Sequence, residues 1–221
     1  MKLFNFLSDR RPPLVEQSLQ NLGGMLETAG EMFAAATAYL LENEALTMDL
    51  SAQDEKVNAW ERAIRRAVLE HMAVDPRDEL TLSLLVLSVV QDAERCGDLA
   101  KSIAKAADLA DAPRMGRHVE ALRAIRDRVQ ALFPQARSAF LAADATAARR
   151  VMEEHDALKK EVTHYLKELA SADDVTPNLA VVLAVASRMV GRVSSHLSNI
   201  ISSVVMPFDQ IRRSPTWGDD E

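Results

Sequence analysis

The sequence predicts an all-α protein built from two tandem three-helix bundles, a six-helix up-and-down fold. Apolar residues make up 48% and charged residues 27% of the 221 residues, as in an ordinary globular chain. Glycine is scarce, with 7 residues, and aromatic residues make up 5%, while Ala, Leu, Glu and Arg are plentiful. This balance favours helix over sheet. Apolar residues recur at helical spacing in six segments, and the order of these segments repeats.

The first half of the chain predicts three helices. The first is expected over 14–42, where apolar residues recur at three- and four-residue steps. The second is expected over 44–72, and an Asp-Pro pair at 75–76 follows it, since the residue before a proline avoids the helical region. The third is expected over 78–110. It is apolar nearly all round at 80–90, so we expect it to be the buried centre of its bundle.

The second half repeats this order. A fourth helix is expected over 114–141, interrupted or kinked at Pro134. A fifth is expected over 145–170 and a sixth over 178–205, which Pro207 ends. The sixth, like the third, opens with an apolar run. The helix order therefore predicts a duplicated unit.

The duplication is clearest in the third helix of each half. Residues 78–103 align without gaps to residues 175–200 at a constant offset of 97. Four aligned pairs matter most: Glu94 with Gly191, Arg95 with Arg192, Asp98 with Ser195, and Ile103 with Ile200. The expected organisation is a leader at 1–13, a first bundle at 14–111, a second bundle at 112–206 and a tail at 207–221.

The charge balance argues against nucleic-acid binding. The net charge is −7, the isoelectric point is about 5.3, and no Lys/Arg run could make a basic patch. The single cysteine, Cys96, cannot form an internal disulfide, which favours a reducing compartment. No histidine stands at helical spacing to activate it, so we interpret it as a small packed thiol.

No apolar window reaches the ~18 residues of a spanning helix. The leader lacks the apolar core and small-residue cleavage site of a signal peptide, so a cytoplasmic protein is expected. Its apolar residues Leu3, Phe4, Phe6 and Leu7 are interpreted as a frayed or locally packed terminus, with peripheral contact to a membrane or a partner as the alternative.

Two acidic residues on the third helix are the strongest candidate site. Glu94 and Asp98 are four residues apart, so their side chains share one helix face and repel each other. A hard cation with oxygen ligands would offset the repulsion, as would an arginine of a neighbouring helix. Asp54 and Asn58 are also four apart, at a similar height on the second helix. These four residues predict a cation site between two helices. The alternatives are a solvated face or a polar seam with Arg95.

Other residue patterns do not favour an enzyme. Glu161 and His164 form a single E-x-x-H motif, whereas ferritin-like di-iron bundles need two such motifs and two further inward glutamates. No Ser-His-Asp or Cys-His arrangement suggests nucleophilic catalysis, and no glycine-rich loop opens a helix as a phosphate cradle would.

The segment ERCGDLAKSI at 94–103 resembles the ERIGD(H/L)AxNI signature of the PhoU family of bacterial phosphate-uptake regulators. The resemblance extends to LQNLGGMLETAG at 19–30, to the Asp54–Asn58 turn and to RVSSHLSNI at 192–200. It implies two tandem three-helix bundles whose E/D-x-x-x-D motifs bind metal. In this chain Gly191 and Ser195 replace both acids of the second motif. The resemblance therefore implies at most one metal site, of unknown divalent or iron-type identity, unless His196 and Asp156 supply a second.

The resemblance also implies a function. It predicts a cytoplasmic, non-enzymatic regulator or accessory protein of phosphate uptake, phosphate signalling and homeostasis, which binds a phosphate transporter component or a sensor kinase. Two alternatives remain: a metal-free accessory subunit of a sodium- or proton-coupled phosphate carrier, and a carboxylate-bridged metalloenzyme. A homodimer is expected, because the apolar surface of the third and sixth helices exceeds what one bundle can cover.

Overall fold

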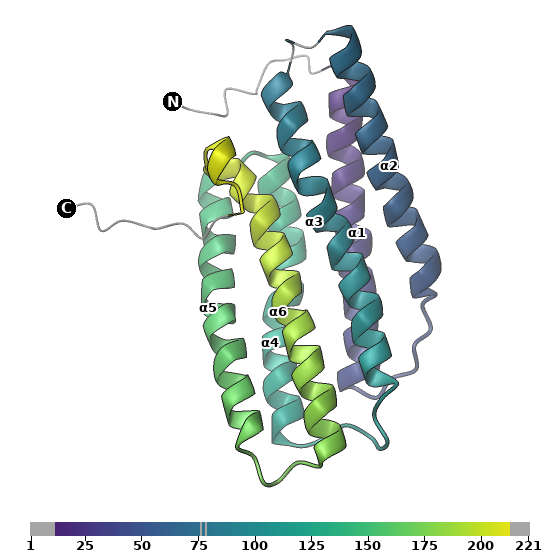
Figure 1. The fold of residues 1–221 in the computed structure, drawn as a ribbon, viewed down its shortest axis with the longest axis vertical. Helices are drawn as coiled ribbons and strands as arrows, with labels where there is room; N and C mark the ends of the chain where they lie inside the picture. The colour runs from purple at the N-terminus through teal and green to yellow at the C-terminus, as the bar shows by residue number, and fades with distance from the viewer. Residues whose placement is uncertain (1–11, 76, 78, 213–221) are drawn as a thin grey trace, which may run out of the picture.

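The computed structural model describes residues 12–75, 77 and 79–212, and these residues form helices and connections without a strand (Figure 1). The elements are α1 (Pro13–Leu41), α2 (Leu50–Val74), α3 (Leu80–Ala107), α4 (Arg117–Leu141), α5 (Ala145–Ala170), α6 (Pro177–Val205) and the short 3-10 helix η1 (Phe208–Gln210). The predicted all-α class is confirmed. Across this part of the chain, no helix is long and apolar enough to cross a membrane.

The second helix starts later than the sequence analysis predicted. Residues 43–49 form a connection, and α2 begins at Leu50 rather than at Glu44. Asn43 has a positive φ of 57°, which ends the helical path after α1. The Asp49 carboxylate then accepts a hydrogen bond from the backbone N–H of Ala52. A helix starts where its first free N–H groups find such a side-chain acceptor, so Asp49 sets this boundary.

The fourth helix also starts later than predicted, and it is not interrupted at Pro134. Gly116 has a φ of 103°, a conformation that favours glycine, and α4 begins at the next residue, Arg117. The helix continues through Pro134 without interruption. Burial of apolar residues on both sides of the proline, Val129 and Leu132 before it and Ala136 and Phe140 after it, keeps the helix intact.

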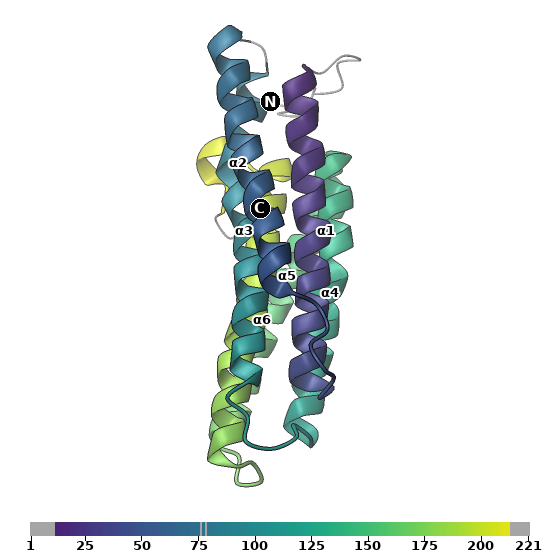
Figure 2. The same cartoon turned by 90° about the vertical axis from the view of Figure 1, so that its right-hand side faces the viewer.

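The six helices pack as the duplicated sequence predicted. Helices α1, α2 and α3 pack against one another, as do α4, α5 and α6. The two groups meet where α3 packs on α6 and α1 packs on α4 (Figures 1 and 2). The apolar α3 therefore lies against α1, α2 and α6, which confirms its central position. The apolar faces of α3 and α6 cover each other within one chain, so the homodimer stays a prediction without this support.

Close contact between α1 and α4 depends on small residues of α1. A Cβ placed on Gly30 would lie 3.1 to 3.2 Å from the Phe133 side chain, which is closer than ordinary packing allows. Phe133 in turn packs on Phe33, with ring centroids 5.6 Å apart. Gly30 also accepts a hydrogen bond from Gln130 at its carbonyl oxygen. Glycine at this position thus lets the two bundles approach.

The leader residues 1–11 and Trp217 of the tail lie outside the described residues. The prediction made for the leader stays a prediction. The described part of the tail is residues 207–212, which include the η1 turn. Phe208 of η1 is exposed, whereas Arg212 forms hydrogen bonds with α3.

Candidate functional site: a carboxylate and lysine cluster between α2 and α3

The structure places the four predicted site residues on facing turns of α2 and α3. Asp54 and Asn58 lie on α2, and the Asn58 amide donates a hydrogen bond of 3.2 Å to Asp54 Oδ2. Glu94 and Asp98 lie on α3 and are hydrogen-bonded to each other. Asp54 is buried, and the other three are partly buried. The acidic turns of α2 and α3 therefore face each other, as the spacing predicted.

A residue that the sequence analysis did not single out lies at the centre of this cluster. Lys101 Nζ lies 2.6 Å from Asp54 Oδ2 and 3.0 Å from Asp98 Oδ1. One ammonium group therefore bridges α2 and α3. The signal was present in the sequence, because Lys101 follows Asp98 by three residues and so shares its helix face.

Arg95 contributes less to the cluster. Its guanidinium nitrogens lie 3.7 Å from Glu94 Oε2 and 3.5 Å from Asp98 Oδ2. Half of the Arg95 side chain is exposed, so these long contacts are weak ion pairs. The polar seam that the sequence analysis held open as an alternative is thus built mainly from Lys101, with Arg95 at its edge.

The two acids of α3 have opposite protonation behaviour. Burial and the neighbouring Asp98 carboxylate raise the pKa of Glu94 to about 7. Burial opposes ionisation of Asp98 as well, but hydrogen bonds from Lys101 and Glu94 outweigh it and lower the Asp98 pKa. Near neutral pH the pair therefore shares a proton, with Glu94 as its donor and Asp98 as its acceptor.

One oxygen of the cluster is not satisfied. Asp54 Oδ1 is buried without a hydrogen-bond partner among the described residues. A Cβ added to Gly97 of α3 would lie 3.7 Å from this oxygen and 3.6 Å from Met32 Sδ. These are ordinary contact distances, so packing does not require glycine here. An alanine methyl group would therefore fit beside the buried Asp54 Oδ1.

The cluster is not arranged as a metal cage. Two of its carboxylates already face an ammonium ion, and the third is paired with a neighbouring acid. Among the residues the structure describes, no group of three or more His, Cys, Asp or Glu side chains could hold a metal ion. A metal at Glu94, Asp98, Asp54 and Asn58 would need Lys101 to move away and Glu94 to lose its proton.

A second polar cluster, at the contact of α3 and α6, was not predicted from the sequence. Asp92 is 4% exposed and accepts hydrogen bonds from His196 Nδ1 at 2.9 Å and Asn199 Nδ2 at 2.9 Å. Arg212 of the tail adds an ion pair at 2.7 Å and a hydrogen bond to the Ser88 carbonyl. Burial opposes ionisation, yet these partners lower the pKa of Asp92. The sequence feature that could have indicated this cluster is Asp92 itself, an acid next to the apolar run of α3.

The second bundle has no counterpart to the carboxylate cluster. His196 faces Asp92 and so does not join Asp156 in an improvised metal site. At the positions aligned with Glu94 and Asp98, Gly191 lies against Val162 and Ser195 donates its hydroxyl to the Gly191 carbonyl. The remaining polar contact across α5 and α6 at this level is between His155 Nδ1 and Ser194 Oγ, at 3.0 Å.

The other candidate residues have structural roles. Cys96 is fully buried and donates to the Asp92 carbonyl oxygen, and burial raises its pKa far above the usual range of a thiol. This agrees with its interpretation as a packed thiol. Glu161 forms an ion pair with Arg128, while His164 is largely exposed beside Glu168. The single E-x-x-H motif therefore does not face the bundle interior.

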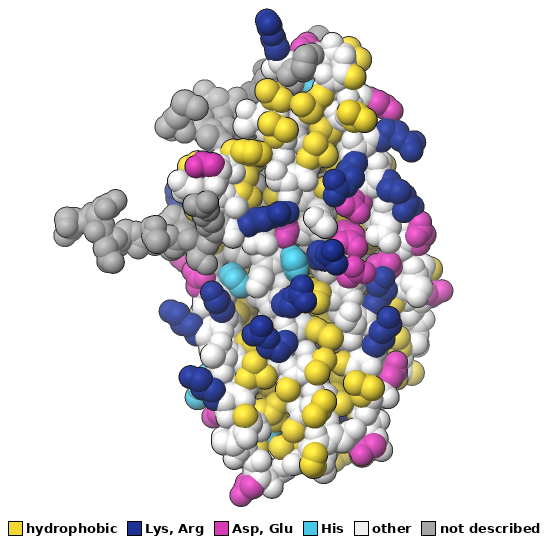
Figure 3. All heavy atoms as spheres, viewed as in Figure 1, with side chains coloured by type: hydrophobic (Ala, Val, Ile, Leu, Met, Phe, Trp, Pro, Cys, Tyr) yellow, Lys and Arg dark blue, Asp and Glu magenta, His cyan; other side chains and the backbone are white. Residues whose placement is uncertain are grey.

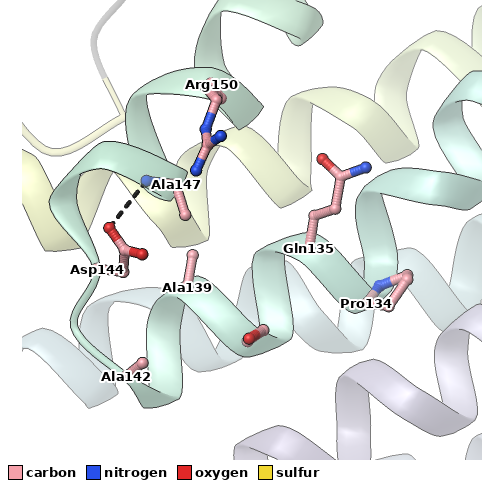
Figure 4. Close-up of a pocket in the computed structure, with 8 residues that line it drawn as sticks. Pro134, Gln135, Ala139, Ala142, Asp144, Ala147 and Arg150 are labelled. Atoms are coloured by element: carbon pink, nitrogen blue, oxygen red, sulfur yellow. Dashed lines mark hydrogen bonds between the residues drawn. The ribbon is translucent and has the colours of Figure 1, made fainter.

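A pocket of about 560 Å³ lies between α4 and α5, away from both clusters (Figure 4). Its walls are mostly small residues, including Ala139, Ala142 and Ala147. The Asp144 carboxylate at its edge caps α5 by accepting from the backbone N–H groups of Thr146 and Ala147. Arg150 is the one cation among the residues that line it. The pocket offers little chemistry for catalysis.

Together the fold and the α2–α3 cluster define a class: a protein of two tandem three-helix bundles with an acidic turn retained in the first bundle only. The PhoU domain family model matches residues 22–107. The first bundle is therefore similar to a PhoU domain, in agreement with the resemblance of the ERCGDLAKSI segment. No curated protein matches the chain.

Two solved structures extend this likeness over both bundles. PhoU from Pseudomonas aeruginosa is 24% identical with a TM-score of 0.80, and the match covers 87% of this chain and 95% of that chain. The phosphate transport system regulatory protein PhoU from Streptococcus pneumoniae is 18% identical with a TM-score of 0.77, covering 86% and 93% of the two chains. Most of the chain, across both bundles, thus has the same fold as these two proteins.

Proposed function

We propose that this protein is a regulator or accessory protein of phosphate transport and phosphate signalling that acts by binding another protein. The PhoU domain match over residues 22–107 carries this proposal. The Streptococcus pneumoniae protein with the same fold is described as a phosphate transport system regulatory protein. We propose a phosphate transporter component or a sensor kinase as the partner and the cytoplasm as the site of action.

A binding role also suits the chemistry of the described residues. The acids of the candidate site are paired with Lys101 or with each other. The cysteine is buried, and no described group of ligands could hold a metal. These features give no support to the carboxylate-bridged metalloenzyme.

The α2–α3 cluster then serves to fix one helix against another. Lys101 holds Asp54 of α2 beside Asp98 of α3 and so sets the height at which the two helices meet. The Lys101 ammonium already supplies a positive charge between the carboxylates. We therefore propose that the protein acts without a metal while Lys101 bridges Asp54 and Asp98. Metal binding at Glu94, Asp98, Asp54 and Asn58 stays a prediction in which a divalent or iron-type ion displaces Lys101.

Elemental analysis separates these two states. The untagged wild-type protein is compared with Lys101→Gln, with Glu94→Gln/Asp98→Asn and with Lys105→Gln, an exposed lysine one turn further along α3. We expect little metal in the wild type and in Lys105→Gln, and more in Lys101→Gln because its carboxylates lack a counter-charge. Stoichiometric metal in the wild type, lost in the double variant, would instead make the acidic turn a metal site.

The regulatory function is tested in the source organism. Deleting the gene is expected to change the rate of labelled phosphate uptake and the expression of a phosphate-starvation reporter, and the wild-type gene should restore both. Unchanged uptake and unchanged reporter expression would contradict the proposal. Co-purification from crosslinked cells then distinguishes a transporter or kinase from a sodium- or proton-coupled carrier, and light scattering tests the proposed homodimer.

A further inference from the structure

A basic pocket in the second bundle occupies the place that the acidic cluster occupies in the first. It lies between α5 and α6 and has a volume of about 240 Å³. Its lining residues are His155, Lys159, Val162, Thr163, Arg188, Gly191, Arg192 and Ser195. None of these eight is an acid, although the whole chain carries a net charge of −7.

The aligned residues of the two halves explain why the pocket is basic where the first bundle is acidic. Arg192 aligns with Arg95, whose guanidinium contacts Glu94 and Asp98 in the first bundle. The residues aligned with those two acids are Gly191 and Ser195. Arg192 has therefore kept its charge while losing both carboxylate partners.

The facing helix also changes from acidic in the first bundle, on α2, to basic in the second, on α5. In the first bundle Asp54 of α2 lies beside Gly97, and Asn58 follows it by four residues. Ser194 aligns with Gly97, and it contacts His155 of α5, which Lys159 follows by four residues. An acid and an amide in the first bundle are thus matched by a histidine and a lysine in the second.

The cations of the pocket have no carboxylate partner among the described residues. No ion pair joins Lys159, Arg188 or Arg192 to an acid in that part of the chain, and all three are exposed. Arg188 and Arg192 are four residues apart on one face of α6, so they repel each other. Two nearby acids of α5, Glu154 and Glu161, are bound instead by Arg128 of α4. Lys and Arg side chains gather over α5 and α6 (Figure 3).

The hydroxyl groups around the pocket are already used within their helices. Ser194 and Ser195 donate to the Gly191 carbonyl, and Thr163 donates to the Lys159 carbonyl. The free donors are therefore the ammonium of Lys159 and the guanidinium groups of Arg188 and Arg192. Three cationic donors around a small opening suit a compact anion with several acceptor oxygens.

We propose that this pocket binds a small tetrahedral oxyanion, inorganic phosphate, through Lys159, Arg188 and Arg192. The volume is below the ~300–1,000 Å³ that is typical of pockets for drug-sized ligands, which favours a small ion. The arrangement of the three cations around the pocket supports an anion site, whatever the function of the protein. The choice of phosphate among oxyanions rests on the proposed function in phosphate regulation. The site would let the second bundle sense the ion whose transport the protein regulates.

Isothermal titration calorimetry with inorganic phosphate at constant ionic strength tests the proposal. The wild-type protein is compared with Arg188→Gln, Arg192→Gln and Lys159→Gln. Lys160→Gln is the matched control, because Lys160 is an exposed neighbour on α5 that does not line the pocket. We expect saturable binding of one phosphate per chain, weakened about tenfold or more by each pocket substitution and unchanged in the control. Thermal melting confirms that the exposed-residue variants fold.

The absence of saturable phosphate binding in the wild type overturns the proposal. Equal phosphate binding by the pocket variants and the control overturns it as well. Flotation with vesicles of phosphatidylcholine and phosphatidylglycerol tests a lipid phosphate as the source, and binding to vesicles without binding to free phosphate also overturns it. A protein that regulates uptake in cells but binds no phosphate would refute this site and leave the proposed regulatory function intact.

Discussion

At the scale of the residue, the charge of one side chain decides how the candidate site is interpreted. Glu94, Asp98 and Asp54 could be found from their spacing, because four residues separate neighbours on a helix face. The role of Lys101 depends on the distance between α2 and α3, which the sequence does not contain. The ammonium lies between two carboxylates, so the same acids form a bridged helix contact in place of an open cation site.

The raised pKa of Glu94 predicts how this site responds to pH. In the folded protein Glu94 has a pKa of about 7, above the usual value of 4.5. The folded state therefore holds the proton more tightly, and the stabilisation this gives is complete below pH 4.5 and lost as pH rises through 7. Glu94→Gln, which keeps the neutral shape, should be more stable than the wild type at pH 8, by on the order of 1–3 kcal/mol.

Urea unfolding of wild type and Glu94→Gln at pH 5 and pH 8 measures this effect. The difference between the two proteins should be small at pH 5 and should favour the variant at pH 8. Glu70→Gln is the control, because Glu70 is an exposed acid of α2 outside the cluster. An equal difference at both pH values would show that Glu94 stays ionised in the folded state.

At the scale of the element, the sequence predicted where each helix lies more accurately than the residue at which it begins. Helical periodicity marks the middle of a helix, where apolar residues face the core. The starts of α2 and α4 depend instead on single residues, the Asp49 cap and the positive φ of Gly116. Pro134 was expected to interrupt α4, but burial on both sides of it holds the helix together. Local signals and packing compete at such positions, and only the packed structure shows which prevails.

A pair of glycine substitutions tests how the elements pack. A methyl group on Gly30 of α1 would meet Phe133 of α4 at 3.1 to 3.2 Å, whereas one on Gly97 of α3 would meet its neighbours at 3.6 Å or more. Alanine favours helix over glycine by about 1 kcal/mol in both cases. Gly30→Ala should therefore destabilise the protein by about 1–3 kcal/mol through overpacking. Gly97→Ala should be neutral or stabilising.

Thermal and urea unfolding of the two alanine variants provide the comparison. Equal stability of Gly30→Ala and wild type would mean that Phe133 moves aside freely and that the approach of α1 to α4 does not need a glycine. A large loss for Gly97→Ala would mean that the space beside Asp54 Oδ1 matters to folding.

At the scale of the whole molecule, the duplicated bundles are joined by a contact that the sequence did not reveal. The repeat predicted two bundles and a buried α3, and both are present. It did not predict that α3 and α6 pack on each other, because the same apolar runs could equally have met in a second chain. The polar residue at this contact, Asp92, is bound by two side chains of α6 and by Arg212 of the tail.

Replacement of Asp92 tests whether this contact stabilises the whole protein. Asp92→Ala leaves His196, Asn199 and Arg212 without their common acceptor, which should cost about 2–3 kcal/mol at pH 7. The pKa of Asp92 is lowered in the folded protein, so its stabilisation is present above the usual value of 3.8 and lost as pH falls through the folded-state pKa. The deficit of the variant should therefore shrink in acid.

Urea unfolding of wild type and Asp92→Ala at pH 7 and pH 3 measures this change. Arg212→Gln is the matched control, because its side chain is 43% exposed and its loss leaves Asp92 with two partners. It should cost less than half as much as Asp92→Ala. A single cooperative transition that shifts in both variants would show that the two bundles unfold together through the α3–α6 contact. Two separate transitions in Asp92→Ala would show that this one acid is what couples the duplicated halves.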